Sequence, residues 1–569
     1  MSQKNKYSLL WVALGGLLFL PGLGQVHLFD WDEINFAEIS REMIALEDYM
    51  RVYVNYEPFW EKPPLFFWIQ AMSMQLFGIN EFAARLPNAI CGMLTLVILY
   101  RLGYFLRGHL FGMLWAGGYL GSILPHLYFR SGILDPWFNL FIFLGLCGLI
   151  AGCWKRKGWL AHGASSNYRY LVVGGFCLGL AVLIKGPAAW IIVGLTALMY
   201  LLLGKFKMFI SVPQTLLFVL FAVLPPTLWL GIETWSNGPW FAEAFTRYQY
   251  RLFTTSDAGH KGFFGFHLVI LLFGCFPASI YALRGFGLHR LENKRDRNAW
   301  FWMTLLLFVV LFLFTAVQSK IVHYSSMCYF PLTYLAALGA FHLIGEKTRW
   351  RRWMSAVFWL IGGLIVLVCL AAPIVAKNID WLRPFLAKDA FALGNLDAQI
   401  DWPVSTFIPG VFLLAVMVVF FRLQSTGAFR KAVGYLFAGS AFFIFLSLAF
   451  FIKRVEGYSQ RAAIAFYESL EGKDVYVMTY GFKSYAHIYY FDKPIPGDFN
   501  PRKASQGSEM SFQQHRSSDP EWLLYGDIDK DVYIATKITK VEQLLAIQGV
   551  TELYRSNGFV FCKRPHIRL

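Results

Sequence analysis

Residues 355–376 read SAVFWLIGGLIVLVCLAAPIVA, a stretch of 22 residues without a charged side chain. A helix of about 20 apolar residues is long enough to cross the hydrocarbon core of a bilayer. Stretches of the same kind recur from one end of the 569-residue chain to the other. This recurrence predicts an all-α membrane domain that crosses the bilayer many times.

The composition favours a membrane protein over a set of soluble domains. Hydrophobic residues make up 57% of the chain and charged residues only 15%, whereas soluble domains carry about 25% charged residues. Counting the apolar stretches predicts about thirteen transmembrane helices. They cover residues 8–26, 82–103, 109–127, 136–153, 170–184, 187–203, 209–230, 263–284, 299–317, 325–344, 355–376, 405–422 and 432–452.

The net charge of +16 has two interpretations. One is a nucleic-acid partner, and the other is a membrane topology in which Lys and Arg collect in short cytoplasmic loops. The basic residues punctuate the apolar stretches and form no single basic domain. We therefore predict a membrane topology and no nucleic-acid partner.

The positions of the basic residues also predict the orientation. No small-residue cleavage site follows the first apolar stretch, which favours a retained helix over a signal peptide. If the N-terminus is cytoplasmic, alternate connections should be basic. They are basic at 101–107, 155–157, 205–207, 284–297, 347–352 and 430–431. The long connections then lie outside, at 30–81, 231–262 and 377–404, as does the tail from residue 453.

Two domains follow from this pattern. Residues 1–452 form the transmembrane domain, with the first outer loop at 27–81, and residues 453–569 form a soluble domain outside the membrane. Strand-like and helical stretches alternate in the tail, which predicts a small α/β domain. The expected strands lie at 475–478, 487–491 and 532–535, and the expected helices at 460–470 and 540–547.

The first outer loop carries a dense group of ionisable residues from Asp30 onward. Asp30 or Asp32 can cap a helix that runs to about Leu46. Apolar residues such as Phe36 and Met43 would share one side of it, as in a helix that lies in the membrane interface. The alternative to a capping role for Asp32 is a chemical one.

Several cations stand on the same predicted outer face. Lys62 follows Glu61 and precedes a double proline, where it either reaches the headgroup level along its alkyl chain or binds a lipid phosphate. Lys185 stands at a break between two apolar stretches, where it either marks a tight helix turn or pairs with a carboxylate. Positive-inside sorting would not place cations here, so together they favour an anionic lipid or phosphate ligand.

Six short motifs, in this order along the chain, resemble those of the C-type glycosyltransferases, the GT-C fold. The resemblance is strongest to the bacterial 4-amino-4-deoxy-L-arabinose lipid A transferases and more distant to the protein O-mannosyltransferases. It covers about residues 1–345. The motifs are DEINFAEISREM at 32–43, EKPPL at 61–65, EFAARLP at 81–87, LDP at 134–136, LIKGP at 183–187, and Ser319-Lys320 followed by Tyr324 and Pro331.

This resemblance implies a reaction at the outer face of the bacterial inner membrane. Such enzymes move a sugar from a polyprenyl phosphate, such as undecaprenyl phosphate, to a lipid, glycan or protein acceptor, usually with inversion. By motif match Asp32 is the catalytic base, Lys62 binds the leaving phosphate, and Asp135 supports them. Donor or acceptor contacts are implied for Glu33, Asn35, Glu61, Arg251, His260, Lys320 and Tyr324, and then for Lys185, Arg85, Arg247 and His323. The resemblance implies no metal for the chemistry, although a divalent ion stays an alternative.

The chain departs from the aminoarabinose transferases at two places. Those enzymes usually have an Arg three residues after the loop aspartate, where this chain has Asn35. Their Glu-His pair in the third outer loop appears here as Arg247-Tyr248, if Arg251 is the matching arginine. Both changes fall where donor or acceptor contacts are expected, so the sugar and the acceptor stay open.

Two other functions fit a polytopic chain of this kind. One is a transporter or flippase for a lipid-linked sugar, and the other is an oligosaccharide ligase that moves a preassembled glycan. Transporters often show internal repeats and broken helices near the bilayer midplane. This sequence has no obvious repeat, and its candidate polar groups gather at the outer mouth. It also lacks a P-loop or a Rossmann glycine pattern, which agrees with a lipid-linked sugar as donor.

Overall fold

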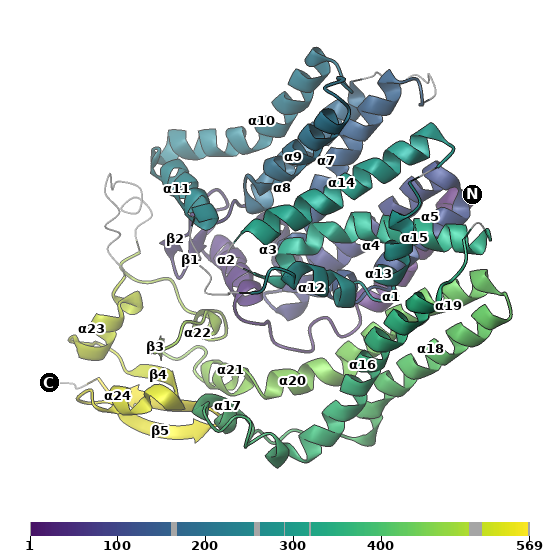
Figure 1. The fold of residues 1–569 in the computed structure, drawn as a ribbon. Coiled ribbons are helices and arrows are strands. Elements are labelled where there is room, and N and C mark those ends of the chain that lie inside the picture. The colour runs from purple at the N-terminus through teal and green to yellow at the C-terminus, as the bar shows by residue number, and fades with distance from the viewer. Residues whose placement is uncertain are drawn as a thin grey trace.

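The computed structural model describes residues 2–160, 168–254, 262–289, 291–317, 320–346, 348–499 and 515–566. A large assembly of helices forms most of the molecule, and a small sheet lies at one side of it (Figure 1). The first outer loop lies between these two parts. The arrangement is that of a helical membrane domain with an α/β domain at one end.

The helical assembly follows the predicted apolar stretches. Its helices are α1 (Gln3–Phe19), α4 (Glu81–Arg107), α5 (His109–Leu120), α6 (Ile123–Tyr128), α7 (Asp135–Arg156), α8 (Arg169–Lys185), α9 (Ala188–Leu203), α10 (Val212–Asn237), α12 (Phe266–Gly274), α13 (Ala278–Phe286), α14 (Lys294–Ala316), α15 (Tyr329–Ile344), α16 (Arg352–Lys377), α18 (Ile408–Ser425) and α19 (Phe429–Ser447).

The predicted count of thirteen spans is not confirmed. Within the described ranges, eight helices are long and apolar enough to cross a membrane, or nine if α12 and α13 are one bent span. The chain bends by 117° between these two helices. Pro277 stands at the break, where its ring disrupts a continuous helix. The stretch 109–127 is likewise divided into α5 and α6. Three other predicted spans form helices of only 16 or 17 residues, namely α1, α8 and α9.

Glycines allow neighbouring helices to approach closely in this assembly. A Cβ atom on Gly148 of α7 would lie 2.6 Å from the Cα of Gly174 on α8. Small residues that bring backbones together are typical of membrane helix pairs, where packing replaces the hydrophobic effect. The close α7–α8 pair fixes the relative positions of Asp135 at the start of α7 and Lys185 at the end of α8.

The first outer loop folds into helix α2 (Asp32–Leu46), a hairpin of β1 (Tyr53–Val54) and β2 (Glu57–Pro58), and helix α3 (Leu65–Phe77). The predicted extent of α2 is confirmed, but the capping role of Asp32 is wrong. The N-cap residue is Trp31, which makes no side-chain cap. Asp32 instead lies in the first turn, where a carboxylate interacts favourably with the helix dipole.

Helix α2 is buried rather than exposed at the membrane interface. Phe36 and Met43 pack into the core of the membrane domain, whereas Ile34 and Ala37 pack against C-terminal residues such as Ile464. Polar contacts also join α2 to its surroundings. Arg41 of α2 donates hydrogen bonds to Glu38 and to Asp492 of the C-terminal domain. The interpretation of α2 as an interfacial helix is therefore wrong, because the C-terminal domain covers its outer side.

The C-terminal part has four strands and several short helices. The sheet order is β3-β4-β6-β5, with β3 and β4 parallel and the other pairs antiparallel. The elements are α20 (Lys453–Gly457), α21 (Arg461–Glu468), β3 (Tyr476–Tyr480), α22 (Ala486–Tyr489), α23 (Pro520–Tyr525), β4 (Val532–Lys537), α24 (Val541–Leu545), β5 (Thr551–Ser556) and β6 (Phe559–Arg564). The small α/β domain is confirmed, with strands at two of the three expected places.

The expected strand at 487–491 is wrong, because this stretch begins in the helical turn α22. Its aromatic residues have a strand-like propensity, but tertiary packing overrides it. Tyr490 is buried against the first outer loop, where its hydroxyl accepts from the backbone N–H of Leu28 and donates to Glu81. The turn of α22 is what directs Tyr490 toward these partners.

A histidine joins the two parts of the molecule. His27 Nδ1 lies 2.9 Å from Glu456 Oε1, and His27 Nε2 lies 3.4 Å from Glu468 Oε1. Arg461 also binds Glu456, at 2.6 Å. Burial alone would lower the pKa of His27, but the carboxylates of Glu456, Glu468 and Glu81 outweigh it and raise the pKa. The folded protein therefore favours a protonated imidazole at this junction.

This junction predicts a pH-dependent stability. The pKa of His27 is above its usual 6.5 in the folded state. The contribution of His27 to the free energy of unfolding is therefore fully present below about pH 6.5, and it is lost as the pH rises through the pKa of the folded state. We expect the thermal midpoint of the purified protein to fall between pH 6 and pH 8, and His27→Gln to flatten that slope. Thermal unfolding followed by tryptophan fluorescence measures the midpoint at each pH. Equal slopes of midpoint against pH in the wild type and in His27→Gln would contradict the prediction.

Candidate active site

A cavity of about 1140 Å³ opens where the first outer loop meets the ends of the membrane helices. Loop residues, residues of α7, α8 and α11 (Trp240–Thr254), and two residues of the C-terminal domain line it. Eleven of the fourteen site residues predicted from the sequence lie on its wall. They are Asp32, Glu33, Asn35, Glu61, Lys62, Arg85, Asp135, Lys185, Arg251, His323 and Tyr324.

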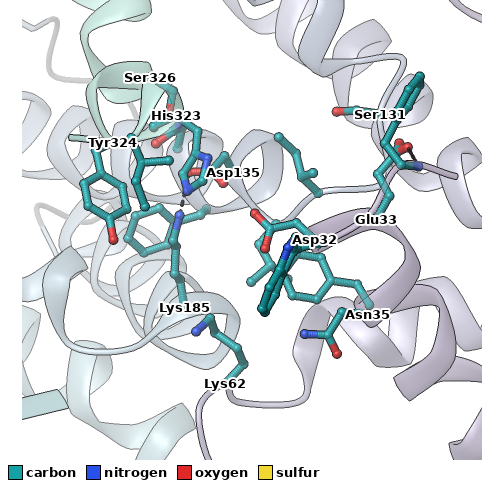
Figure 2. A pocket seen from close by; sticks show the side chains of 18 of the residues that line it. Asp32, Glu33, Asn35, Lys62, Ser131, Asp135, Lys185, His323, Tyr324 and Ser326 are labelled. Atoms are coloured by element: carbon teal, nitrogen blue, oxygen red, sulfur yellow. Dashed lines mark hydrogen bonds and ion pairs between the residues drawn. The ribbon is translucent and has the colours of Figure 1, made fainter. Parts of the chain in front are cut away.

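Asp32 differs from the other carboxylates of the cavity in having no partner among the described residues. It projects from the first turn of α2 toward the space between Lys62 and the Asp135 group (Figure 2). Within the described parts of the chain its carboxylate makes no hydrogen bond and no ion pair within 4.0 Å. A half-buried anion of this kind is free to accept a proton or to orient a bound group.

Lys62 and Arg251 converge on one aromatic ring. Lys62 Nζ lies 5.2 Å from the ring centre of Tyr248, and the Arg251 guanidinium carbon lies 5.5 Å from it. Glu61 accepts a hydrogen bond from the Tyr248 hydroxyl and lies 3.7 Å from Lys62 Nζ. Burial lowers the pKa of the Lys62 ammonium, while Glu61 and Asp32 oppose that effect. Two cations on one wall form a site suited to a phosphate.

A second charged group, formed by Lys185 and Asp135, lines the same cavity. Lys185 Nζ lies 2.7 Å from Asp135 Oδ1 and 5.8 Å from the ring centre of Tyr324. His323 lies beside this pair, as Figure 2 shows. The structure therefore selects the ion-pair interpretation of Lys185 over a simple helix turn.

Glu33 and Arg85 line the cavity but are bound to each other. Arg85 forms two hydrogen bonds to the Glu33 carboxylate, which also accepts from the backbone N–H groups of Phe29 and Gly132. Burial would raise the pKa of Glu33, but Arg85 and these donors lower it. This pair fixes the start of α2 to α4, and so positions the neighbouring Asp32.

Asn35 has an unsatisfied acceptor. Its side chain is 8% exposed, and its Oδ1 has no hydrogen-bond partner within the described residues. Buried polar atoms are normally paired. This oxygen has almost no exposed surface, so it does not open onto the cavity, although Asn35 lines the wall.

Three predicted site residues do not line the cavity. Lys320 donates to the backbone carbonyls of Phe314, Thr315 and Val317, so it caps the C-terminal end of α14, where a cation interacts well with the helix dipole. Arg247 is exposed on α11 and does not belong to the wall. His260 lies outside the described residues.

Comparisons with known proteins find relatives of this chain in sequence and in fold. Residues 61–229 match the family described as dolichyl-phosphate-mannose-protein mannosyltransferase. Proteins named undecaprenyl phosphate-alpha-4-amino-4-deoxy-L-arabinose arabinosyl transferase are similar in sequence. The one from Photorhabdus laumondii is 25% identical over 398 residues, or 66% of this chain and 68% of that protein. The one from Enterobacter sp. strain 638 is 27% identical over 393 residues, or 66% and 67%.

The fold is shared with ArnT from Cupriavidus metallidurans. Its crystal structure bound to undecaprenyl phosphate superposes with a TM-score of 0.74 at 17% identity, and the match covers 98% of each chain. The crystal structure of the apo state gives the same TM-score. The chain is a glycosyltransferase with the C-type fold. The predicted resemblance to the aminoarabinose transferases is confirmed, as is the prediction of an enzyme.

The glycosyltransferase cavity also contains residues that the sequence did not single out. Lys483 and Tyr485 of the C-terminal domain line it, as does Trp31 beside Asp32. No motif marks these residues, and Lys483 and Tyr485 stand more than 400 positions after the catalytic loop. Only the folding of the C-terminal domain onto α2 brings them here.

Within the described residues, no three His, Cys, Asp or Glu side chains are grouped closely enough to hold an ion. The steps proposed below use only side chains of the chain itself.

Proposed function

We propose that the chain transfers a sugar from a polyprenyl phosphate, of the undecaprenyl type, to a lipid A-like glycolipid at the outer face of the bacterial inner membrane. One observation carries the proposal: the unpartnered Asp32 carboxylate and the Lys62–Arg251 cation pair open onto one cavity. That cavity is large enough for a lipid phosphate and a sugar together. The names of the relatives and of the ArnT structure support the same donor chemistry.

The cations act on the leaving group. As the bond between the anomeric carbon and the carrier phosphate oxygen breaks, negative charge develops on the departing polyprenyl phosphate. Lys62 and Arg251 stabilise this charge more in the transition state than in the ground state, which lowers the barrier. Tyr248 and Glu61 position the Lys62 ammonium through the contacts described above.

Asp32 acts on the acceptor. An acceptor hydroxyl loses its proton to the carboxylate as its oxygen forms the new bond to the anomeric carbon. If the acceptor group is a phosphate, it is already ionised, and Asp32 orients it or stabilises positive charge on the sugar. Asp135 with Lys185 forms a further part of the cavity wall.

The proposed orientation puts the N-terminus in the cytoplasm and the C-terminal domain on the outer side. The alternation of basic connections supports it. The cavity lies on the side of the helices that carries the C-terminal domain. A polyprenyl donor would then enter from the outer leaflet, between apolar helices.

The experiment is transfer by the purified protein in detergent from a panel of undecaprenyl phosphate sugars to lipid A. We expect one donor to yield a glycosylated lipid A and free undecaprenyl phosphate in equal amounts, as resolved by mass spectrometry. A micelle has no compartments, so a transporter or flippase would leave every donor intact. Turnover of only an oligosaccharide-linked carrier would favour the ligase instead.

A further inference from the structure

A short segment of the C-terminal domain reaches the active-site cavity. Lys483 and Tyr485 stand between β3 and α22 and line the cavity together with first-loop residues. The backbone N–H of Tyr485 donates to Asp30 Oδ1 over 3.3 Å. The first outer loop therefore holds this segment at a fixed place on the wall.

Together with Trp31, the residue next to Asp32, this segment forms a cation–aromatic cluster. Lys483 Nζ lies 4.9 Å from the ring centre of Trp31 and 5.6 Å from that of Tyr485. The two rings meet edge to face with their centres 5.9 Å apart. Trp31 is 50% exposed although it lines a cavity. The cluster thus offers a positive charge beside an accessible aromatic surface.

The charge of Lys483 is not neutralised by the protein. Arg85 and Lys185 of the same cavity are each bound to a carboxylate. By contrast, no carboxylate of the described ranges lies within 4.0 Å of Lys483 Nζ. An ammonium group held by two rings and without a carboxylate partner is suited to bind an anionic ligand.

The donor phosphate has cations of its own, Lys62 and Arg251, around Tyr248. In a displacement with inversion the acceptor attacks the sugar from the face opposite the leaving phosphate. An anionic group on the acceptor therefore needs a separate cation on its own side of Asp32. Lys483 is our candidate for this cation, because it lines the same cavity and packs on Trp31, the residue before Asp32.

We propose that Lys483, Trp31 and Tyr485 form a subsite for a phosphate group carried by the acceptor glycolipid. The ammonium of Lys483 binds the phosphate, and Trp31 packs against the adjoining sugar ring. The C-terminal domain thereby determines which acceptors are used. This inference rests on the proposed transferase function.

The test compares lipid A that carries both phosphates with the same lipid A after phosphatase treatment. We expect Lys483→Ala to raise KM for the phosphorylated lipid by about 10-fold or more, as loss of a charge-assisted hydrogen bond does. The KM for the donor should not change, and the dephosphorylated lipid should be used equally by both proteins. Lys483→Arg should restore the affinity. Lys473→Ala, which changes an exposed lysine of the same domain, is the matched control.

A binding measurement without donor separates this inference from the proposed function. Native mass spectrometry of the full-length protein with phosphorylated lipid A should show weaker binding by Lys483→Ala than by the wild type. Equal binding by the two proteins, or binding by neither, would overturn the subsite whatever the transfer assay shows. A clear difference in binding without transfer from any donor would count against the transferase function alone.

Discussion

Exchanging Asp32 for asparagine is expected to lower kcat for sugar transfer by roughly 100- to 10,000-fold, the usual contribution of a positioned general base. Its carboxylate faces the cavity without a hydrogen bond or ion pair to the described residues, so it is available to a bound substrate. An amide keeps the shape but removes the charge and the proton acceptor. Initial rates at saturating donor and acceptor measure the loss.

The control for this variant is Asp135→Asn. Asp135 is buried and bound to Lys185 at 2.7 Å, so its replacement weakens the contact of a half-buried cation and should cost about 1–3 kcal/mol of stability. Asp32→Asn breaks no such contact and loses only a helix-dipole interaction of about 0.3–1 kcal/mol, so it should unfold close to the wild-type temperature. Undiminished turnover in Asp32→Asn would remove Asp32 from the chemistry.

Replacing Lys62 with alanine is expected to lower kcat by roughly 100- to 1000-fold, the usual cost of removing one group that stabilises developing negative charge. The ammonium is buried against Tyr248 and lies beside Glu61, so water does not replace it well. The departing polyprenyl phosphate would then lose one of its two cations. Steady-state rates with a saturating acceptor and varied donor separate kcat from the donor KM.

Two further variants make the Lys62 experiment specific. Lys62→Arg keeps the charge and should retain more activity than Lys62→Ala, although the larger guanidinium fits the site less well. Arg247→Ala removes an exposed cation of α11 that does not line the cavity and should leave both constants unchanged. A raised donor KM with an unchanged kcat would mean that Lys62 binds the donor equally in the ground and transition states.

The helices were largely predictable, because hydropathy acts on each stretch of chain separately. The number of full spans was not, because breaks such as the one at Pro277 depend on how neighbouring helices pack. The strand expected at 487–491 failed for the same reason. Its aromatic side chains turn toward the first outer loop, a partner that is distant in the sequence.

The candidate site was predictable to the extent that motifs name residues. The motif order pointed to Asp32 and Lys62, and the structure brings both to one cavity. It does not bring Lys320 there, since that ammonium is bound by the last carbonyls of α14. A motif records that a residue type recurs at a position but not which atoms it contacts.

By itself, the sequence determined that this chain is a helical membrane protein with a small sheet-containing region at its C-terminal end and ionisable residues in its first long loop. Only the tertiary structure decided that α2 is buried, that Glu33 is bound by Arg85 while Asp32 stays unpartnered, and that Lys483 completes the wall. The physical reason is that hydropathy depends on local composition, whereas ion pairs and cavity walls depend on distances between segments far apart in the chain.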